Sequence, residues 1–329
     1  MVYNFDLYKN SMLRKAASMK RRNFLALSGL TSIYLPVISY TKLWSRKTDN
    51  AKSETDFIVP DINELRKLSK VIVGDLPTKI NVTKVADTIR PANVVVEGAS
   101  ENEKMTLART VYQIEFSKGN VMIDTGMDLE THNTFGKTED PFYPENFEMV
   151  NKALLASNLI ILTHYHADHT AGIVRSKDFE KLAHKVWLTK DTAKLMLEKP
   201  HKPTIEISKE KLSQFNIVDF EMYYPIAPGV AIFKAPGHTP DSKMLYIQLA
   251  NGKEFIHSVD SGWSMQNIIQ EKMKNASWVN ENEELLLLQY KWLNKIMKEN
   301  PEIYVLCTHD NEQYSDFIKR GILGGKLKI

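Results

Sequence analysis

Short apolar runs separated by turn residues occur along most of the chain from residue 57 onward. Residues 109–116 alternate polar and apolar positions and lead through Lys118-Gly119-Asn120 into the apolar run 121–124, which predicts a β-hairpin. A second hairpin is predicted for 243–249 and 254–259, because Asn251-Gly252 between them favours a type I′ turn. Over 280–299, apolar residues recur at helical spacing, which predicts a long helix with Trp292 in the core.

Further elements are predicted on both sides of these segments. A short helix is expected after Asp61, a suitable N-cap. Strands are predicted over 70–74, 79–85, 92–97, 158–163, 185–189, 216–224, 229–234 and 303–308. Helices are predicted over 145–157, 176–184 and 191–198, with another beginning near Ala171. The stretch 216–224 is expected to pair with 229–234, and the order of elements suggests an α/β fold of two βα halves.

One stretch, Thr163-His164-Tyr165-His166-Ala167-Asp168-His169-Thr170, concentrates the candidate chemistry. It directly follows a predicted strand, so it lies on a loop at a strand's carboxyl end, where α/β proteins place ligands. Alternate residues of an extended loop point the same way, so His164 and His166 can bind one metal ion while Asp168 and His169 face a second. Imidazole and carboxylate ligands suit zinc, iron or manganese.

Polar residues also stand at the ends of other predicted strands. His238 lies in Ala235-Pro236-Gly237-His238-Thr239-Pro240, Asp260 follows 254–259, His309 follows 303–308, and Asp124-Thr125-Gly126 follows the first hairpin. Together with the histidine stretch, these motifs resemble the signature of the metallo-β-lactamase-fold hydrolases, in the family's order. The resemblance extends over residues 70 to 320, most of the chain.

The resemblance implies an αββα sandwich, two mixed β-sheets flanked by helices, with the site at the edge between the sheets. The implied ligands are His164, His166 and His238 for one metal ion, and Asp168, His169 and His309 for the other, with Asp260 bridging. The cofactors would be two divalent ions, with zinc the first expectation, and a metal-bridging hydroxide would attack the substrate. Asp168 would also carry a proton toward the leaving group, and Asp124 would orient ligands from behind.

The same resemblance favours cleavage of a carboxylic ester-type bond in a small molecule, a lactone or related ester. The pattern is most similar to the N-acyl-homoserine lactonase branch, which shares the bridging aspartate and the pair His309-Asp310. That branch has Tyr three residues after the bridging Asp; Trp263 stands there in this chain, and we expect it behind the ligands or beside the substrate. Thioester, β-lactam, phosphodiester and sulfate-ester hydrolysis are alternatives, as is, in a different class, a non-catalytic metal-binding envelope protein.

Charge and composition set the N-terminus apart from the rest. Residues 1–52 carry +8 and the whole chain +3, so the remainder carries −5, which argues against nucleic acid as a partner. Lys20-Arg21-Arg22-Asn23-Phe24-Leu25 opens the uncharged apolar segment 23–41 and resembles a twin-arginine export signal. We expect 1–55 to be an export signal or anchor with a linker, and 56–329 to be the catalytic domain. The protein would be periplasmic, or anchored by 23–41 in the inner membrane and facing the periplasm.

Other candidate side chains are given structural interpretations. The single Cys307 excludes an internal disulfide and is expected to pack in the core. His132, His184 and His201 fit no ligand spacing and are expected at the surface. For the aromatic-rich connection 128–146 two hypotheses stand, a substrate-facing lip and a surface loop packed on its own aromatic residues.

Overall fold

The computed structural model describes residues 58–135 and 139–329. The signal or anchor expected within residues 1–55 lies outside these ranges. The described residues belong to one compact unit. Within the described ranges, no helix combines the length and the apolar character needed to cross a membrane.

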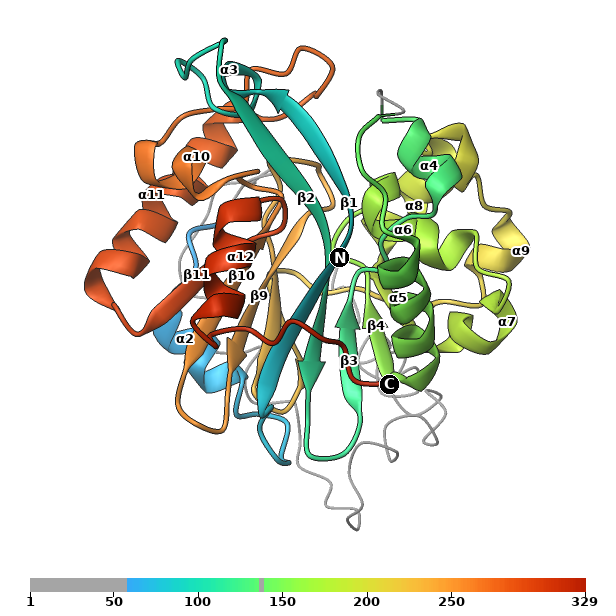
Figure 1. The fold of residues 1–329 in the computed structure, drawn as a ribbon. Helices are drawn as coiled ribbons and strands as arrows, with labels where there is room; N and C mark the ends of the chain where they lie inside the picture. Colours follow the sequence, from blue (N-terminus) through green and yellow to red (C-terminus); the bar gives the residue numbers. More distant parts are fainter. Residues whose placement is uncertain (1–57, 136–138) are drawn as a thin grey trace, which may run out of the picture. The chain divides into compact units, whose positions relative to one another are not determined.

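Two β-sheets lie face to face, with helices against their outer faces (Figure 1). The first sheet has the order β1 (Lys79–Pro91), β2 (Lys104–Glu115), β3 (Asn120–Ile123), β4 (Leu159–Ile161), β5 (Val186–Thr189) and β6 (Asn216–Val218). The second has the order β11 (Ile303–Cys307), β10 (Glu254–Val259), β9 (Lys243–Gln248), β8 (Val230–Lys234) and β7 (Tyr223–Ala227). Both contain parallel and antiparallel pairs, for example β3 with β4 and β2 with β3. The predicted αββα sandwich is therefore confirmed.

The helices divide between the two outer faces (Figure 1). The first sheet is covered by α5 (Pro144–Ala156), α6 (Ala167–Val174), α7 (Phe179–Leu182), α8 (Lys190–Glu198) and α9 (Lys209–Leu212), with α4 (Leu129–Asn133), η2 (Ala183–Lys185) and η3 (Pro203–Ile205) nearby. The second is covered by α2 (Ile62–Leu68), α10 (Met265–Gln270) and α11 (Glu283–Glu299). The remaining helices, α3 (Ala92–Val95) and α12 (Asn311–Lys319), both contact β2.

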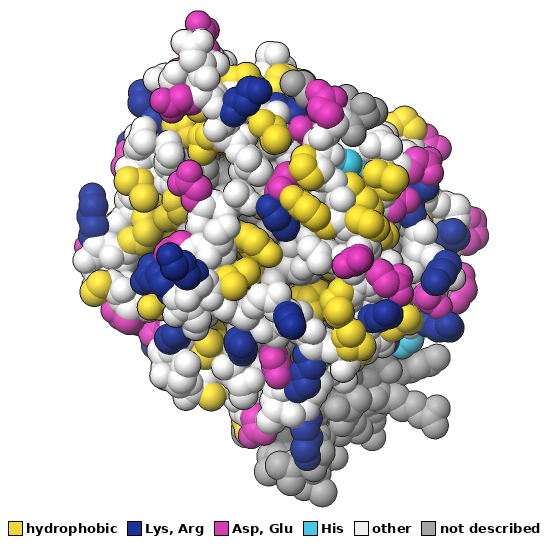
Figure 2. All heavy atoms as spheres, in the orientation of Figure 1, with side chains coloured by type: hydrophobic (Ala, Val, Ile, Leu, Met, Phe, Trp, Pro, Cys, Tyr) yellow, Lys and Arg dark blue, Asp and Glu magenta, His cyan; other side chains and the backbone are white. Residues whose placement is uncertain are grey.

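Apolar side chains fill the spaces between these layers. Val82, Ile161 and Leu245 are among those buried between the sheets. Trp292 of α11 packs on Phe233 of β8, with ring centres 5.7 Å apart, and is buried as predicted. Cys307 is buried and free, also as predicted. On the face seen in Figure 2, acidic and basic side chains are interspersed, so over its described residues this face carries no broad basic patch of the kind that binds nucleic acid.

Both predicted hairpins are present, but the turn at Asn251-Gly252 is not of type I′, because only Gly252 has a positive φ there. Three strand predictions are also wrong. Residues 70–74 form turns and a bend, and 92–95 form the helix α3. The stretch 216–224 is divided between the sheets, because β6 pairs with β5 while β7 pairs with β8. Short apolar runs fit a buried strand and a buried helical turn equally well, so tertiary packing decides between them.

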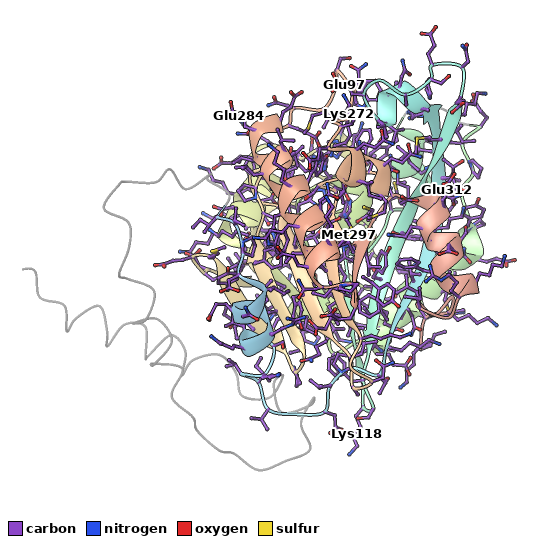
Figure 3. The ribbon with its side chains drawn as sticks, turned by 90° about the vertical axis from the view of Figure 1, so that its left-hand side faces the viewer. Glu97, Lys118, Lys272, Glu284, Met297 and Glu312 are labelled. Atoms are coloured by element: carbon purple, nitrogen blue, oxygen red, sulfur yellow. The ribbon has the colours of Figure 1, made fainter. Side chains whose placement is uncertain are left out.

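The strand ends that matter for function lie at one end of this unit. Lys118, in the turn from β2 to β3, marks the opposite end, and Glu97 and Lys272 mark the near end (Figure 3). There the backbone of Glu97 donates a hydrogen bond to the carbonyl of Met273 at 2.8 Å. The parallel strands β3 and β4 run from the Lys118 turn toward this end, so the loops that follow them gather there.

Candidate metal centre

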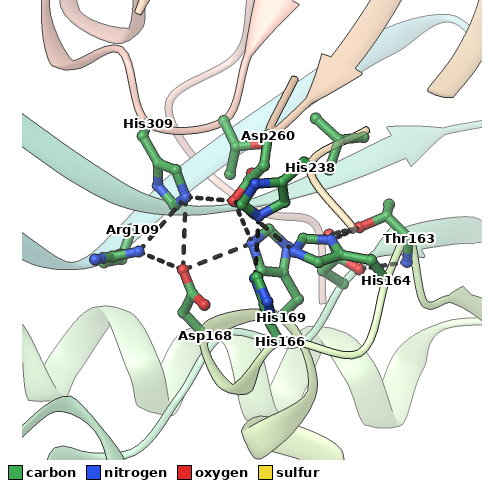
Figure 4. A network of polar contacts seen from close by, with 12 residues as sticks. Arg109, Thr163, His164, His166, Asp168, His169, His238, Asp260 and His309 are labelled. Atoms are coloured by element: carbon green, nitrogen blue, oxygen red, sulfur yellow. Dashed lines mark hydrogen bonds and ion pairs between the residues drawn. The ribbon is translucent and has the colours of Figure 1, made fainter. Parts of the chain in front are cut away.

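Seven side chains converge where loops from both sheets meet (Figure 4). One group of ligand atoms, the three-histidine half, comes from His164, His166 and His238. The other, the carboxylate half, comes from Asp168, His169, Asp260 and His309. Within each half the ligand atoms lie within 4.8 Å of one another, and every residue except the half-buried His166 is buried. The structure thus brings together all seven residues that the resemblance implies as ligands.

The loop after β4 supplies four of these side chains because a helix begins within it. His166 is the N-cap of α6 and has extended backbone, His164 lies in the bend before it, and Asp168 and His169 lie in the first helical turn. That change of backbone direction sends the two pairs to different halves. The helix begins at Ala167 rather than near Ala171 as expected.

Asp260 lies between the two halves. Its Oδ2 is 2.9 Å from His309 Nε2, 3.3 Å from His169 Nε2, 3.4 Å from His238 Nε2 and 3.9 Å from His164 Nε2. One carboxylate oxygen therefore faces two nitrogens from each half. Among the described residues, Asp260 Oδ1 and His164 Nε2 are buried without a hydrogen-bond partner, a state that costs about 1–3 kcal/mol per group. Cations between these atoms would remove that cost.

Four of the imidazoles are oriented through Nδ1, so that Nε2 faces the centre. Nδ1 of His164 contacts Thr163 Oγ1 at 3.1 Å, and Nδ1 of His169 contacts Asp124 Oδ2 at 2.7 Å. Nδ1 of His309 contacts the carbonyl of Ala108 at 2.7 Å, and Nδ1 of His238 contacts the carboxylate of Glu281. A carbonyl or carboxylate can only accept, so in His169, His238 and His309 Nδ1 carries a proton, and Nε2 is the nitrogen left to bind a metal ion. Metal-binding histidines are held in this way in proteins. The donor set therefore fits two divalent cations.

Asp124 supports the centre from the end of β3. It accepts hydrogen bonds from the backbone N–H and the hydroxyl of Thr163, each at 2.8 Å, and it also contacts His169. Its φ of +63° is unusual for a residue other than glycine. One carboxylate thus links the strand end before the histidine loop to a ligand in the carboxylate half, which is the position that the resemblance implies.

The backbone before Asp260 is strained. Val259 has a φ of +53°, which is costly for a β-branched residue, and the pairing of β10 with β11 shifts between His257 and Val259. His257 Nδ1 accepts the Val259 N–H at 3.1 Å, and burial lowers the pKa of His257 to about 3, so this acceptor stays unprotonated. Strain of this kind persists where the surroundings enforce it, commonly at functional sites.

A buried lysine links the backbone of Asp260 to the carboxylate that orients His238. Lys274 donates to the carbonyls of Asp260 (2.8 Å) and Ser261 (2.9 Å) and lies 2.6 Å from Glu281, the carboxylate that orients His238. Burial alone would raise the pKa of Glu281, but Lys274 and His238 lower it overall. Sequence reasoning missed both residues, because the segment 271–282 has no periodicity or recognisable motif.

Charge is distributed unequally over the site. Burial, together with the neighbouring imidazoles, lowers the pKa of His164 and of His166 well below the ordinary value. Burial would also lower the pKa of His169, but Asp260, Asp168 and Asp124 raise it well above that value. The carboxylate half therefore holds its ionised carboxylates next to positive charge, whereas the three-histidine half consists of neutral imidazoles.

Arg109 of β2 is a further residue that sequence reasoning missed. Its guanidinium donates to Asp168 Oδ2, and Nη1 is 3.5 Å from His309 Nε2 (Figure 4). Burial would raise the pKa of Asp168, but Arg109, with His169 and His309, lowers it. This environment favours an ionised Asp168 acting as a ligand over an Asp168 that carries a proton.

Two histidines expected at the surface lie elsewhere, and both predictions are wrong. His201 is half-buried, with its ring 4.1 Å from that of His166, and its Nδ1 accepts the Ala167 N–H at 3.1 Å. Burial lowers its pKa to about 4, so it is neutral with the proton on Nε2. His132 is 2% exposed and its Nε2 contacts the carbonyl of Asp140 at 3.0 Å. His184 is exposed, as predicted.

Trp263 is buried beside the centre. It packs with Val95, Val96, Leu107 and Ala276. The ammonium of Lys274 lies 5.3 Å from the centre of its ring. Lys274 also donates to the carbonyl of Asp260, so it connects Trp263 to the backbone of a ligand residue. Trp263 therefore lies behind the ligands.

Comparison with known proteins gives a family match and several similar sequences. Residues 106–251 match the model of the Metallo-beta-lactamase superfamily. The chain is 25% identical over 216 residues to an N-acyl homoserine lactonase of Bacillus thuringiensis, a match covering 61% of this chain and 81% of that protein.

Solved structures with the same fold include lactonases. One, an N-acyl homoserine lactone hydrolase with the product N-hexanoyl-L-homoserine at its catalytic metal centre, gives a TM-score of 0.59 at 18% identity and covers 73% of this chain and 96% of that one. AidC, a dizinc quorum-quenching lactonase, gives 0.52 at 13% identity, with 71% and 89% covered. The chain therefore has the metallo-β-lactamase fold, and lactonases are among the proteins that it resembles.

Proposed function

We propose that this chain, which has the metallo-β-lactamase fold, is a dinuclear metal hydrolase that opens a lactone or cleaves a related small ester. The observation that carries the proposal is Asp260 Oδ2, which lies within 3.9 Å of imidazole nitrogens from both halves of the site. Two like-charged cations held close together need an anion between them, and Asp260 is placed to be that anion. The proteins that resemble this chain in sequence and in fold include lactonases, and this supports a lactone as the substrate.

The chain's own residues account for positioning and charge. When bound, two divalent ions, with zinc the first expectation, supply Lewis acidity toward the substrate carbonyl and lower the pKa of the attacking water. In His169 and His309 fixed partners hold the Nδ1 proton, so Nε2 is the nitrogen that would bind a metal ion. No serine or cysteine nucleophile is needed, in keeping with the burial of Cys307 and the raised pKa that this burial gives its thiol.

Aromatic and polar groups lie near His166 of the three-histidine half. Phe135, from the connection 128–146, lies 5.7 Å from the ring of His201, and Tyr165 lies 6.2 Å from that ring. His201 offers its Nε2–H as a donor, because its Nδ1 already accepts a backbone N–H. These contacts support a substrate-facing lip at this connection, with an apolar wall and one directed hydrogen-bond donor for a carbonyl or amide oxygen.

The test is hydrolysis by the purified metal-loaded chain on a panel of N-acyl homoserine lactones, thioesters, β-lactams and phosphodiesters. We expect lactone hydrolysis that is lost in Asp260→Asn and retained in the matched control His184→Ala, because His184 is exposed and outside the site. Activity confined to thioesters or β-lactams would redirect the substrate assignment. Two bound cations with no turnover on any member would instead support a non-catalytic metal-binding protein.

We also propose that the protein is exported, on the basis of the basic, twin-arginine-like start and the apolar segment 23–41. A reporter that is active only outside the cytoplasm, fused after residue 55, tests this. Its activity should disappear when Arg21 and Arg22 are both changed to lysine. A reporter that stays inactive with the natural sequence would remove the proposal.

A further inference from the structure

We infer that Arg109 makes the two halves of the metal centre unequal, so that the carboxylate half binds its cation more weakly than the three-histidine half. The inference rests on the proposed dinuclear centre. It concerns the order and affinity of metal binding, which the proposed reaction leaves open.

The first step is the position of the charge. Arg109 lies in β2 opposite Ala86 of β1, and its side chain extends toward the carboxylate half. Nη1 contacts Asp168 Oδ2 and is 3.5 Å from His309 Nε2. These are two of the atoms that the carboxylate half offers to a cation. A permanent positive charge therefore stands directly beside that cation site.

The second step is that this charge is held in place. Nε of Arg109 donates to Thr88 Oγ1 at 3.2 Å, and the guanidinium carbon lies 4.7 Å from the centre of the Phe135 ring. The side chain is 11% exposed. Moving it into solvent would break these contacts, so its repulsion toward a cation is not relieved by a simple rotation.

The third step is the contrast with the other half. There the neighbouring cation, Lys274, reaches His238 only through Glu281, whose carboxylate lies 2.6 Å from it and offsets its charge. In the carboxylate half, Arg109 offsets the charge of Asp168, which reduces the attraction for a metal ion. A divalent ion a few ångströms from a guanidinium is repelled strongly enough, even at the dielectric constant of water, to weaken binding by about tenfold.

The experiment is a stepwise titration of metal-free full-length chain with Co²⁺, followed by visible absorption and repeated with Zn²⁺ by calorimetry. We expect two binding events whose dissociation constants differ by about tenfold or more. Arg109→Met should tighten the second event by about tenfold and leave the first unchanged. Arg109→Gln, which keeps a polar side chain without the charge, should do the same and serves if the methionine variant does not fold.

The matched control is Arg66→Met, because Arg66 also forms ion pairs, with Glu254 and Glu302, away from the ligands. It should leave both dissociation constants unchanged. Two equal affinities in the unmodified chain would overturn the inference while leaving the proposed function intact. Weaker second binding in both Arg109 variants would also overturn it, because Arg109 would then be holding Asp168 in place for the metal. A chain that binds no metal would overturn the proposed function and this inference together.

Discussion

Replacing Lys274 by methionine removes a buried charge that ties the two ends of the metal centre together. The ammonium donates to the carbonyls of Asp260 and Ser261 at 2.8 and 2.9 Å and contacts Glu281 at 2.6 Å. Its side chain is 1% exposed and that of Glu281 is 7% exposed. Methionine has a similar length without the charge, so the change leaves a buried carboxylate and two carbonyls without their donor.

Breaking a buried ion pair by removing one partner costs about 3–5 kcal/mol. We therefore expect Lys274→Met to lower the free energy of unfolding by about that amount and the melting temperature by about 10 °C. Adding Glu281→Gln should recover about 1 kcal/mol or more, because the pair then loses both charges and the amide oxygen can still accept from His238. The exposed pair Lys295–Glu299 provides the control, and Lys295→Met should change stability by less than about 0.5 kcal/mol.

The assay is urea unfolding followed by fluorescence, with all variants held at one metal concentration because bound metal stabilises the folded state. The pKa of Glu281 is lowered from its ordinary value of 4.5, so the stabilisation it provides is present above that pH and is lost as the pH falls through the lowered pKa. The difference between the natural chain and Lys274→Met should therefore shrink in acid. A Lys274→Met variant within about 1 kcal/mol of the natural chain, or a double variant no better than the single one, would refute this reasoning.

Three further changes test separate parts of the site. Asp124→Asn should weaken metal binding about tenfold to 100-fold in competition with a chelator, because His169 loses its charged partner; unchanged affinity would contradict this. Gly172→Ala should lower the free energy of unfolding by about 1–3 kcal/mol, since its Cβ would come within 2.0 Å of the Thr125 carbonyl; an unaltered melting curve would show that α6 moves freely. His201→Asn keeps a side-chain oxygen that can accept the Ala167 N–H but removes the Nε2–H, so the Michaelis constant should rise at neutral pH with little change in turnover; an equal loss in turnover would assign His201 a role in the chemical step.

The ligands could be predicted from the sequence because they follow apolar strands or lie close together in one motif. His164, His166 and His169 are separated by so few residues that local backbone geometry brings them together. Asp260 and His309 each follow a run that reads as a buried strand, and parallel strands end at the same edge of a sheet. These strand ends indicated where polar side chains gather, and the resemblance carried by the same motifs implied the sandwich fold and the ligand set.

The residues that support the ligands could not be predicted in this way. Arg109 stands within a strand, where its alternation with apolar neighbours also fits a solvent-facing position. Lys274 and Glu281 lie in a segment without periodicity, and only tertiary packing brings them beneath Asp260. His132 was expected at the surface because its connection carries no regular pattern. That connection instead forms the short helix α4, which buries the imidazole beside Phe142, with ring centres 5.8 Å apart.

The central claim is that two cations are held at these seven side chains and that the centre hydrolyses an ester. The most direct measurement is the metal content of the purified full-length chain, determined by mass spectrometry alongside lactone hydrolysis on the same sample. We predict two equivalents of divalent metal per chain, falling together with activity in Asp260→Asn. A chain that is folded and free of bound metal after growth in zinc, iron, manganese or cobalt would contradict the claim.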